Sequence, residues 1–376
     1  MVPPIHGKCA PKFEAVKTAF EMNFAALNEI GASVAVSLEG ELVVDLWGGH
    51  LDEAKTRPWQ EDTLVNVWSS TKPMAAMCLL VLADRGDVDL HAPVSKYWPE
   101  FAQNGKDAVE VRHFLSHSAG LSGMDAPVAH EALYDWDWMT GALAAQAPWW
   151  EPGSQSGYHA LTQGYLIGEV VRRVSGHSLG QFYANEIAGP LGADFHIGTT
   201  EQVDERVSDV IPPAAPIEVA DDDSIASRTF RNPAVDASLA NMRDWRAAEI
   251  PAANGQGNAR AIVRAQTPMA CDGEAFGKTI LSSDGTRRIF EKQTAGLDLA
   301  LGIPVTFGMG YGISSEPMPL GPNPNIAYWG GYGGSIVLID QDARLCFSYV
   351  MNRMEAGLVG DMRGFNLLQA MYQSVA

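Results

Sequence analysis

The chain of 376 residues is 46% hydrophobic and 19% charged, which supplies enough apolar material for one large domain or two closely packed ones. Its 26 Lys and Arg against 45 Asp and Glu give a formal net charge of −19. This charge argues against nucleic acid as a partner, because nucleic-acid binding depends on clustered cations. No apolar run reaches the roughly 18 residues of a membrane span, so no membrane partner is expected.

The N-terminus and the cysteines suggest a compartment. The first eight residues, MVPPIHGK, lack the basic-then-apolar layout of a signal peptide, and we therefore expect a cytoplasmic protein. No CxxC pair and no Cys/His cluster with zinc spacing is present, so neither a metal nor a cofactor is expected. Free thiols, as in a reducing compartment, are predicted for Cys9, Cys78, Cys271 and Cys346.

The N-terminal segment predicts a helix followed by a hairpin. Residues 12–30 place apolar side chains at helical spacing. Residues 34–38 and 42–46 alternate apolar with small or polar residues around the turn Glu39-Gly40, which is typical of a β-hairpin.

The middle of the chain is mainly helical in pattern. Helical spacing is found in residues 74–86, 108–116, 131–146 and 161–188. Between about 200 and 260 the sequence is rich in Pro, Asp, Ala and Asn, and we expect long irregular connections with short helices there.

The C-terminal segment mirrors the N-terminal one. Strands are predicted at 306–313, 335–339 and 345–351, followed by a helix over about 358–373. Together these patterns predict an α/β fold of the α+β type, with an antiparallel sheet built from both termini and flanked by helices. We expect a discontinuous α/β domain of residues 1–66 and 265–376, a mainly helical domain of residues 67–264, and an active site at their interface.

Ser69 and Lys72, in the sequence Ser69-Ser70-Thr71-Lys72, are candidate catalytic residues. The residues that follow are apolar on all sides, which predicts a buried helix that begins near Ser69. Residues i and i+3 share a helix face, so the Lys72 amine can reach the Ser69 hydroxyl. A desolvated lysine can lose its proton near neutral pH and act as a base, and the helix N-terminus favours the negative charge that develops on attack.

The tetrapeptide alone is a weak signal. A serine three residues before a lysine occurs by chance about once in every couple of proteins of this size, and a helix cap with a surface lysine is the ordinary alternative. The context favours function, because a lysine at the start of an all-apolar helix would be buried and would need a partner.

Ser178 is a competing nucleophile, since Gly176-His177-Ser178-Leu179-Gly180 matches the GxSxG nucleophile elbow. That elbow requires a preceding strand, whereas residues 166–174 follow helical spacing. It also requires an acid and then a histidine downstream of the serine, and the only histidine after Ser178 is His196, with none in residues 197–376. We therefore interpret the motif as a junction between two helices.

Five short motifs give the chain a family resemblance. In order they are Ser69-Ser70-Thr71-Lys72, Leu115 to Leu121 (LSHSAGL), Glu151-Pro152-Gly153 before Tyr158-His159-Ala160, Pro190-Leu191-Gly192, and Trp329-Gly330-Gly331. With these motifs in this order, the chain resembles the class C β-lactamase-like serine hydrolases over nearly its whole length. It is most similar to the family VIII carboxylesterases.

The resemblance implies roles for several residues. Tyr158 would be the third catalytic residue, a phenolate near Lys72 that takes the proton of Ser69 and passes it to the leaving group. The backbone N–H groups of Ser69 and Tyr332 would form the oxyanion hole. His117 belongs to one of the motifs, but we expect it only to support the loop that follows a helix.

Substrate-binding residues are expected on the strand that edges the site and among the tryptophans. Trp329, Gly330 and Gly331 would lie on that strand, where glycines let a substrate approach the backbone. Trp136 and Trp150 are expected to add apolar lining. A glycine-rich bulge is the ordinary alternative for the strand, and core packing is the ordinary alternative for the tryptophans.

Two departures from the β-lactamase pattern point to an ester substrate. Class C enzymes usually carry Tyr-x-Asn and Lys-Thr-Gly, whereas this chain has Ala160 and Trp329 in place of the amide and the cation. The remaining apolar pocket suits a short-chain carboxylic ester, a small-molecule substrate. An acyltransferase, a β-lactamase or D-amino-acid peptidase, and a non-catalytic binding protein stay open as alternatives, as do weak β-lactamase side activity and homo-oligomerisation.

Overall fold

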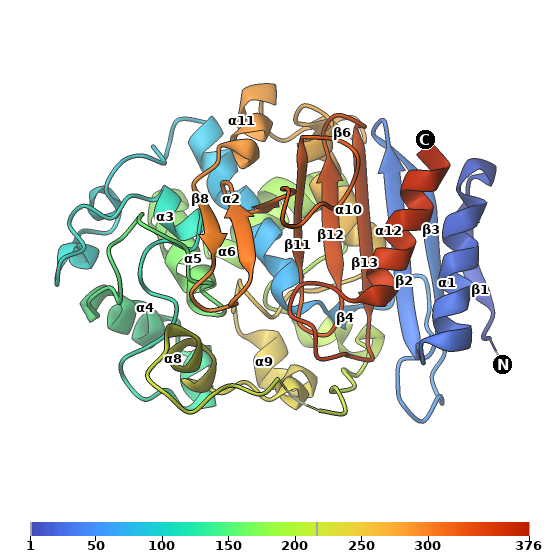
Figure 1. Cartoon of the computed structure of the whole chain (residues 1–376), viewed down its shortest axis with the longest axis horizontal. Coiled ribbons are helices and arrows are strands. Elements are labelled where there is room, and N and C mark those ends of the chain that lie inside the picture. Colours follow the sequence, from blue (N-terminus) through green and yellow to red (C-terminus); the bar gives the residue numbers. More distant parts are fainter. Residues whose placement is uncertain (1, 216, 376) are drawn as a thin grey trace.

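An antiparallel sheet of nine strands organises the fold, which the computed structural model describes for residues 2–215 and 217–375 (Figure 1). The N-terminal strand β2 pairs directly with the C-terminal strand β13, from Leu38 opposite Leu345 to Ala32 opposite Met351. The predicted sheet built from both ends of the chain is therefore confirmed. In spatial order the strands are β1 (Ile5–Cys9), β3 (Glu41–Gly49), β2 (Gly31–Leu38), β13 (Leu345–Met351), β12 (Ile336–Asp340), β11 (Ile326–Gly330), β10 (Gly312–Ile313), β9 (Pro304–Phe307) and β8 (Thr294–Leu297).

Helices cover both faces of this sheet. The first and last helices, α1 (Glu14–Ala26) and α12 (Met362–Val375), lie side by side on one face, and α10 (Ala259–Ala270) packs against β2, β12 and β13 on the other (Figure 1). Every residue of β12 and β13 is buried as a result. The outer strand β1 is mostly exposed and lacks apolar alternation, which explains why its sequence did not predict a strand.

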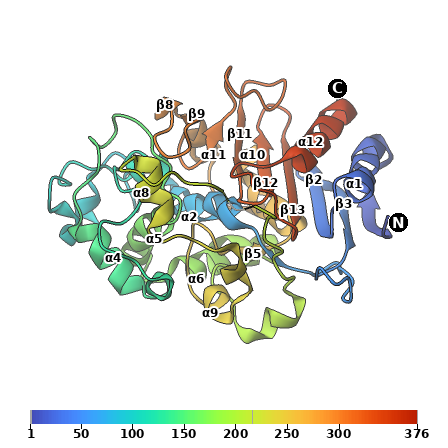
Figure 2. The ribbon, with the colours of Figure 1, turned by 60° about the horizontal axis from the view of Figure 1, so that its bottom comes forward.

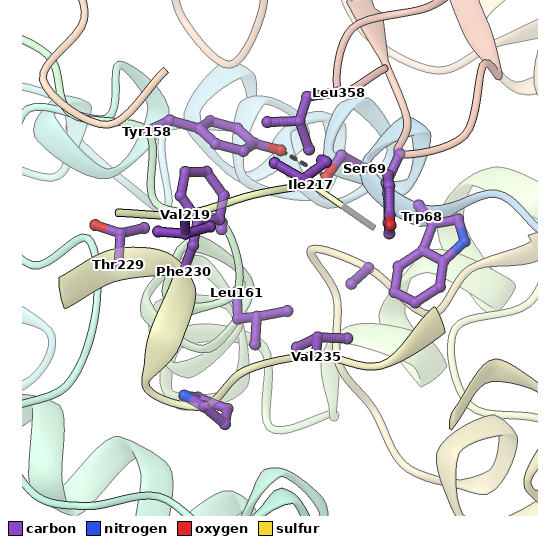
Figure 3. A pocket seen from close by; sticks show the side chains of 14 residues that line it. Trp68, Ser69, Tyr158, Leu161, Ile217, Val219, Thr229, Phe230, Val235 and Leu358 are labelled. Carbon is purple, nitrogen blue, oxygen red and sulfur yellow. Dashed lines mark hydrogen bonds between the residues drawn. The ribbon is translucent and has the colours of Figure 1, made fainter. Parts of the chain in front are cut away.

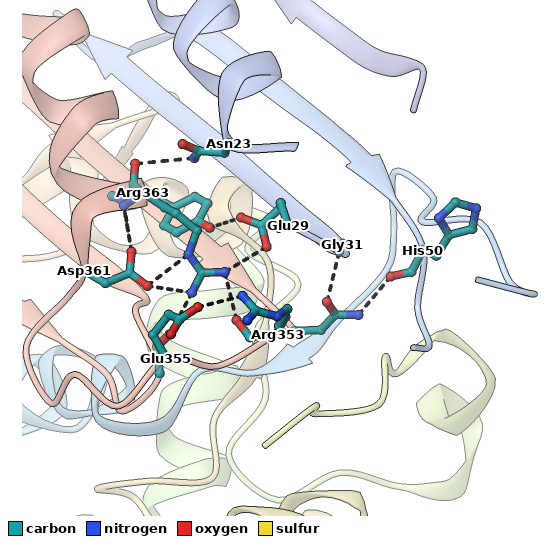
Figure 4. Close-up of polar contacts among 12 residues, drawn as sticks. Asn23, Glu29, Gly31, His50, Arg353, Glu355, Asp361 and Arg363 are labelled. Atoms are coloured by element: carbon teal, nitrogen blue, oxygen red, sulfur yellow. Dashed lines mark hydrogen bonds and ion pairs between the residues drawn. The ribbon is translucent and has the colours of Figure 1, made fainter. Parts of the chain in front are cut away.

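A buried ion-pair cluster joins the terminal segments (Figure 4). The guanidinium of Arg363 in α12 is 3% exposed and donates to the Glu29 carboxylate at 3.1 Å and to the Asp361 carboxylate at 2.6 Å. It also donates to the Gly333 carbonyl at 3.0 Å. Because Gly333 lies in the turn between β11 and β12, the cluster attaches that turn to the last helix.

The helical part of the molecule surrounds α2 (Lys72–Asp84), which contacts α5 (Thr162–Ser175) and α6 (Leu179–Tyr183) (Figure 2). The other helices of this part are α3 (Arg112–Leu115), α4 (Trp136–Ala145), α7 (Gly189–Leu191), α8 (Ile225–Arg231) and α9 (Arg243–Ala247). The predicted irregular region at 200–260 contains only short helices, as expected.

One predicted helix differs from the structure for an identifiable reason. Only one helical turn, α3, forms within 108–116, because the Val109 carbonyl accepts the Val94 N–H and holds the segment extended before it. The helical pattern at 161–188 is divided at Gly176, whose φ of 75° is left-handed and ends α5, which confirms the predicted junction between two helices.

The cysteines and the lengths of the helices can be compared with the sequence predictions. All four cysteines are free thiols, as predicted. Among the described residues, none of the helices combines the length and the apolar character needed to span a membrane.

Candidate active site

Ser69 lies in a 3₁₀ turn, Trp68–Thr71, that leads directly into α2. Trp68 has a left-handed φ of 49°, a conformation that costs a non-glycine residue about 1–3 kcal/mol. The sharp change of direction there separates the short strand β4 (Val65–Asn66) from α2 and leaves Ser69 at the helix entrance. The helix itself is buried from Lys72 to Ala83, as its all-apolar sequence predicted.

The amine of Lys72 is buried beside the Ser69 hydroxyl. Its Nζ lies 3.1 Å from Ser69 Oγ, 2.7 Å from the Ala160 carbonyl and 2.9 Å from the Ala252 carbonyl, and the residue is 1% exposed. Burial holds the pKa of Lys72 well below its ordinary value, which favours the neutral amine. A neutral amine has two N–H donors, which the two carbonyls can accept, and a lone pair that then faces Ser69.

Tyr158 completes a three-residue contact with Ser69. Its hydroxyl donates to Ser69 Oγ at 2.5 Å (Figure 3). Its ring lies against Lys72, with Nζ 4.7 Å from the ring centroid. Burial raises the pKa of Tyr158 well above its ordinary value. The environment thus favours a phenol in the resting site, and not the phenolate that the family resemblance implied.

The turn after β11 approaches the backbone of Ser69. A Cβ atom on Gly331 would lie 2.3 Å from the Val67 carbonyl oxygen and 3.3 Å from the Ser69 nitrogen, so this approach requires glycine. Among the described residues, the N–H of Tyr332 has no hydrogen-bond acceptor. Gly330 has a different environment, because a Cβ there would meet the backbone of Val359 and Gly360 instead of open space.

A cavity of about 140 Å³ opens over Ser69 and Tyr158 (Figure 3). No side chain that lines it among the described residues is ionised at neutral pH. Its wall is largely aliphatic and aromatic. Most of its apolar residues come from Trp68, residues 158–161 and residues 217–235. The lining consists of Trp68, Ser69, Tyr158, Ala160, Leu161, Ile217, Val219, Thr229, Phe230, Pro233, Val235, Ala253, Tyr332 and Leu358.

The prediction that Trp136 and Trp150 line the pocket is wrong, because both indoles are used elsewhere. The Trp136 N–H donates to the Glu169 carboxylate at 2.9 Å, and its ring fills the space beside Gly168. The Trp150 N–H donates to the Gln155 carbonyl at 3.0 Å, and its ring lies over Gly157. In each case a glycine without a side chain provides the packing site.

Trp329 lies behind the site and does not line its cavity. The residue is 2% exposed, and its ring centroid is 5.3 Å from that of Tyr158. The ring also packs against Phe307, with a centroid separation of 5.2 Å. It therefore supports the Tyr158 ring from the side away from the cavity.

Several cavity residues were missed from the sequence. Ile217, Val219, Phe230 and Val235 come from the Pro- and Asp-rich region that was expected to be irregular. The sequence signal that could have identified them is the presence of a few large apolar residues in an otherwise polar loop, because such residues need an apolar surface to pack against.

Ser178 has the structural role that the sequence predicted. It caps α6, where its hydroxyl accepts the Gln181 N–H at 3.3 Å in a capping box. The same hydroxyl donates to Glu249, at 2.5 Å, and α5 precedes the motif where a nucleophile elbow would need a strand.

Comparisons with known proteins identify related sequences and structures along nearly the whole chain. The family model described as Beta-lactamase matches residues 20–371. The chain is 35% identical to "Esterase/beta-lactamase LipL" of Mycobacterium tuberculosis, over 96% of this chain and 86% of that protein. A crystal structure of a family VIII carboxylesterase is 42% identical, with a TM-score of 0.93, and covers 99% of this chain and 100% of its own. A penicillin-binding protein homologue from Caulobacter crescentus is 37% identical, with a TM-score of 0.94 over 99% of this chain and 100% of that chain.

Proposed function

Because the chain belongs to the beta-lactamase family, we propose that it is a serine carboxylesterase that hydrolyses short-chain carboxylic esters through an acyl-enzyme on Ser69. One observation carries the proposal. Ser69 Oγ lies 3.1 Å from a buried lysine amine and 2.5 Å from a buried tyrosine hydroxyl, at the base of an apolar cavity. The names of the esterase and the carboxylesterase to which the chain is similar support ester hydrolysis as the reaction.

In acylation, the neutral amine of Lys72 accepts the Ser69 proton as Oγ attacks the ester carbonyl. The carbonyl oxygen becomes an oxyanion, for which the N–H groups of Ser69 and Tyr332 are the donors. The Tyr158 hydroxyl donates its proton to the departing alkoxide and recovers one from the Lys72 ammonium. The products of this step are an alcohol and a Ser69 ester, and the lysine and tyrosine end in their starting protonation states.

Deacylation reverses the proton path with water as the nucleophile. Water takes the position that the alcohol left, and Tyr158 with Lys72 removes its proton as the oxygen attacks the acyl carbon. The same backbone donors hold the second oxyanion. Collapse of this intermediate returns the proton to Ser69 Oγ and releases the carboxylic acid.

The cavity favours an ester over a β-lactam. A β-lactam brings a carboxylate, and no cationic side chain lines the cavity among the described residues. Burial of that charge without a partner would be costly. The cavity of about 140 Å³ is similar in size to an engineered apolar protein cavity of roughly 150 Å³ that binds benzene. A cavity of this size suits a short acyl chain.

The test compares two serines. Ser69→Ala should abolish hydrolysis of p-nitrophenyl acetate and butyrate, whereas Ser178→Ala should retain it once the variant is shown to be folded. A fluorophosphonate probe should label Ser69 in the wild-type protein, as mass spectrometry of the labelled peptide would show. Full esterase activity in Ser69→Ala, or no adduct on Ser69, would refute the proposal.

Two further assays separate the alternatives on the same site. A chromogenic cephalosporin, run beside a chain-length series of esters, measures any β-lactamase activity. Added methanol tests acyl transfer, because an acyltransferase would form the methyl ester in preference to the acid. Faster turnover of the cephalosporin than of every ester would refute the ester as substrate class and favour a β-lactam instead.

A further inference from the structure

The backbone around Tyr158 is held by an unusual set of contacts. Three successive N–H groups are bound: Gly157 donates to the His117 carbonyl at 3.0 Å, Tyr158 to Asp298 Oδ1 at 2.9 Å, and His159 to His117 Nδ1 at 3.0 Å. His117 thus binds the residues on both sides of Tyr158. Its carbonyl and its imidazole act together on one short loop.

The imidazole of His117 also touches the Tyr158 ring. Their ring centroids are 4.9 Å apart, and Phe307 and Trp329 also pack against His117, with centroids 4.8 and 6.0 Å from that of His117. His117 is 3% exposed. The ring is therefore confined on several sides and has little freedom to reorient.

Nδ1 can accept the His159 N–H only while it carries no proton. Burial, with a smaller contribution from His159 and Lys72, holds the pKa of His117 well below its ordinary value. The imidazole thus stays neutral in ordinary buffers. His117 itself has a left-handed φ of 56°, which a non-glycine residue adopts only uncommonly.

We propose that His117 is a positioning residue for the reaction, which acts by holding the Tyr158 loop so that the tyrosine hydroxyl stays on Ser69 Oγ. This inference rests on the proposed function. The contact to be preserved is the 2.5 Å separation between Tyr158 Oη and Ser69 Oγ. Proton transfer depends steeply on such a distance, and a misplacement of about 1 Å can cost about 10²-fold in rate.

The experiment uses two variants of similar shape. In His117→Asn the side-chain oxygen takes the position of imidazole Nδ1 and can still accept the His159 N–H, and asparagine tolerates the left-handed φ. Leucine in His117→Leu has the same number of side-chain heavy atoms as asparagine but no hydrogen-bond acceptor. The matched control is His113→Leu, because His113 is also buried, at 5% exposed, and accepts a backbone N–H, from Glu110 at 3.2 Å.

Hydrolysis of p-nitrophenyl butyrate should distinguish these variants. We expect His117→Leu to lower kcat by about 10²-fold while KM stays within a few fold. His117→Asn should recover most of this loss, and His113→Leu should leave kcat close to wild type. Thermal unfolding, measured in parallel, ensures that each assay is run on folded protein.

Hydrogen exchange gives a readout that does not depend on activity. The amides of Tyr158 and His159 should exchange faster in His117→Leu than in wild type, and His117→Asn should restore the protection of the His159 amide. If wild-type protein hydrolyses no ester, the proposed function fails, and this exchange pattern still decides whether His117 holds the loop. An unchanged kcat in His117→Leu, equal losses in the Leu and Asn variants, or unchanged exchange would overturn the inference.

Discussion

The hydroxyl of Tyr158 makes the most informative single perturbation, because Tyr158→Phe removes one oxygen and leaves the ring in place. The ring is 2% exposed and packs against His117 and Trp329, with centroids 4.9 and 5.3 Å away, contacts that phenylalanine preserves. The lost interaction is the 2.5 Å hydrogen bond to Ser69 Oγ. Ser69 keeps its neighbour Lys72, at 3.1 Å, so no buried polar atom is left without a contact.

These contacts set different magnitudes for stability and for rate. Loss of one hydrogen bond whose other partner remains satisfied should change the free energy of unfolding by only about 1 kcal/mol. Loss of a general acid and base should lower kcat by about 10²- to 10⁴-fold, or about 3 to 5 kcal/mol in the activation barrier. A variant of nearly wild-type stability with little activity is therefore expected.

Tyr165→Phe is the matched control. Tyr165 is fully buried, and its hydroxyl donates to the Leu133 carbonyl at 2.6 Å, away from Ser69. Removing this hydroxyl leaves a buried carbonyl without its donor and should destabilise the fold by about 1–3 kcal/mol. Its kcat should stay near wild type, so the two variants should show opposite patterns.

Steady-state hydrolysis of p-nitrophenyl butyrate and denaturant unfolding measure the two quantities. Labelling of Ser69 by a fluorophosphonate adds a third readout, which should slow in Tyr158→Phe because the leaving group loses the hydroxyl that donates to it. A Tyr158→Phe protein with wild-type kcat would refute the role of this hydroxyl. Equal loss of activity in Tyr165→Phe would show that the effect is a general consequence of altered packing.

Three further predictions follow from the geometry of the site. Gly331→Ala should abolish most esterase activity, because its Cβ would lie 2.3 Å from the Val67 carbonyl oxygen. Gly141→Ala, at a helix position with open space around it, should retain activity. Equal kinetics for the two variants would contradict the close approach of Gly331 to Val67. Phe230→Ala should enlarge the cavity and shift the preference in kcat/KM toward longer acyl chains, and an unchanged chain-length profile would place the acyl group elsewhere. Burial lowers the pKa of Lys72, and the neutral amine is the base, so kcat/KM should fall as the pH decreases through that lowered pKa. Activity that keeps rising up to the ordinary lysine pKa of 10.5 would contradict the role of Lys72 as the base.

Local patterns in the sequence predicted much of the fold. The hairpin of β2 and β3, the strand β13 and the buried helix α2 were predictable because apolar periodicity records which face of an element is covered. The proximity of Ser69 and Lys72 was predictable for a similar reason, since a spacing of three residues within a helical turn places two side chains together whatever the rest of the chain does. The capping role of Ser178 was equally local.

Tyr158 was predictable from the sequence only in part. Family resemblance singled it out, but the sequence could not show what holds it against Ser69. Its position depends on His117 and Asp298, two residues from distant parts of the chain that bind its loop. The protonation state also depended on tertiary structure, because burial by neighbouring elements raises the pKa of Tyr158 and lowers that of Lys72.

The cavity was decided by tertiary structure alone. Trp136 and Trp150 were expected to line it because they are large and apolar, but each ring instead fills the space beside a glycine, a pairing that no local pattern records. Phe230 lines the cavity although it belongs to a polar, irregular region. The sequence by itself therefore predicted the contact between Ser69 and Lys72 and the individual strands of the sheet, because these depend on neighbours along the chain. Only the folded chain decided which side chains face the substrate, because that depends on contacts between segments far apart in sequence.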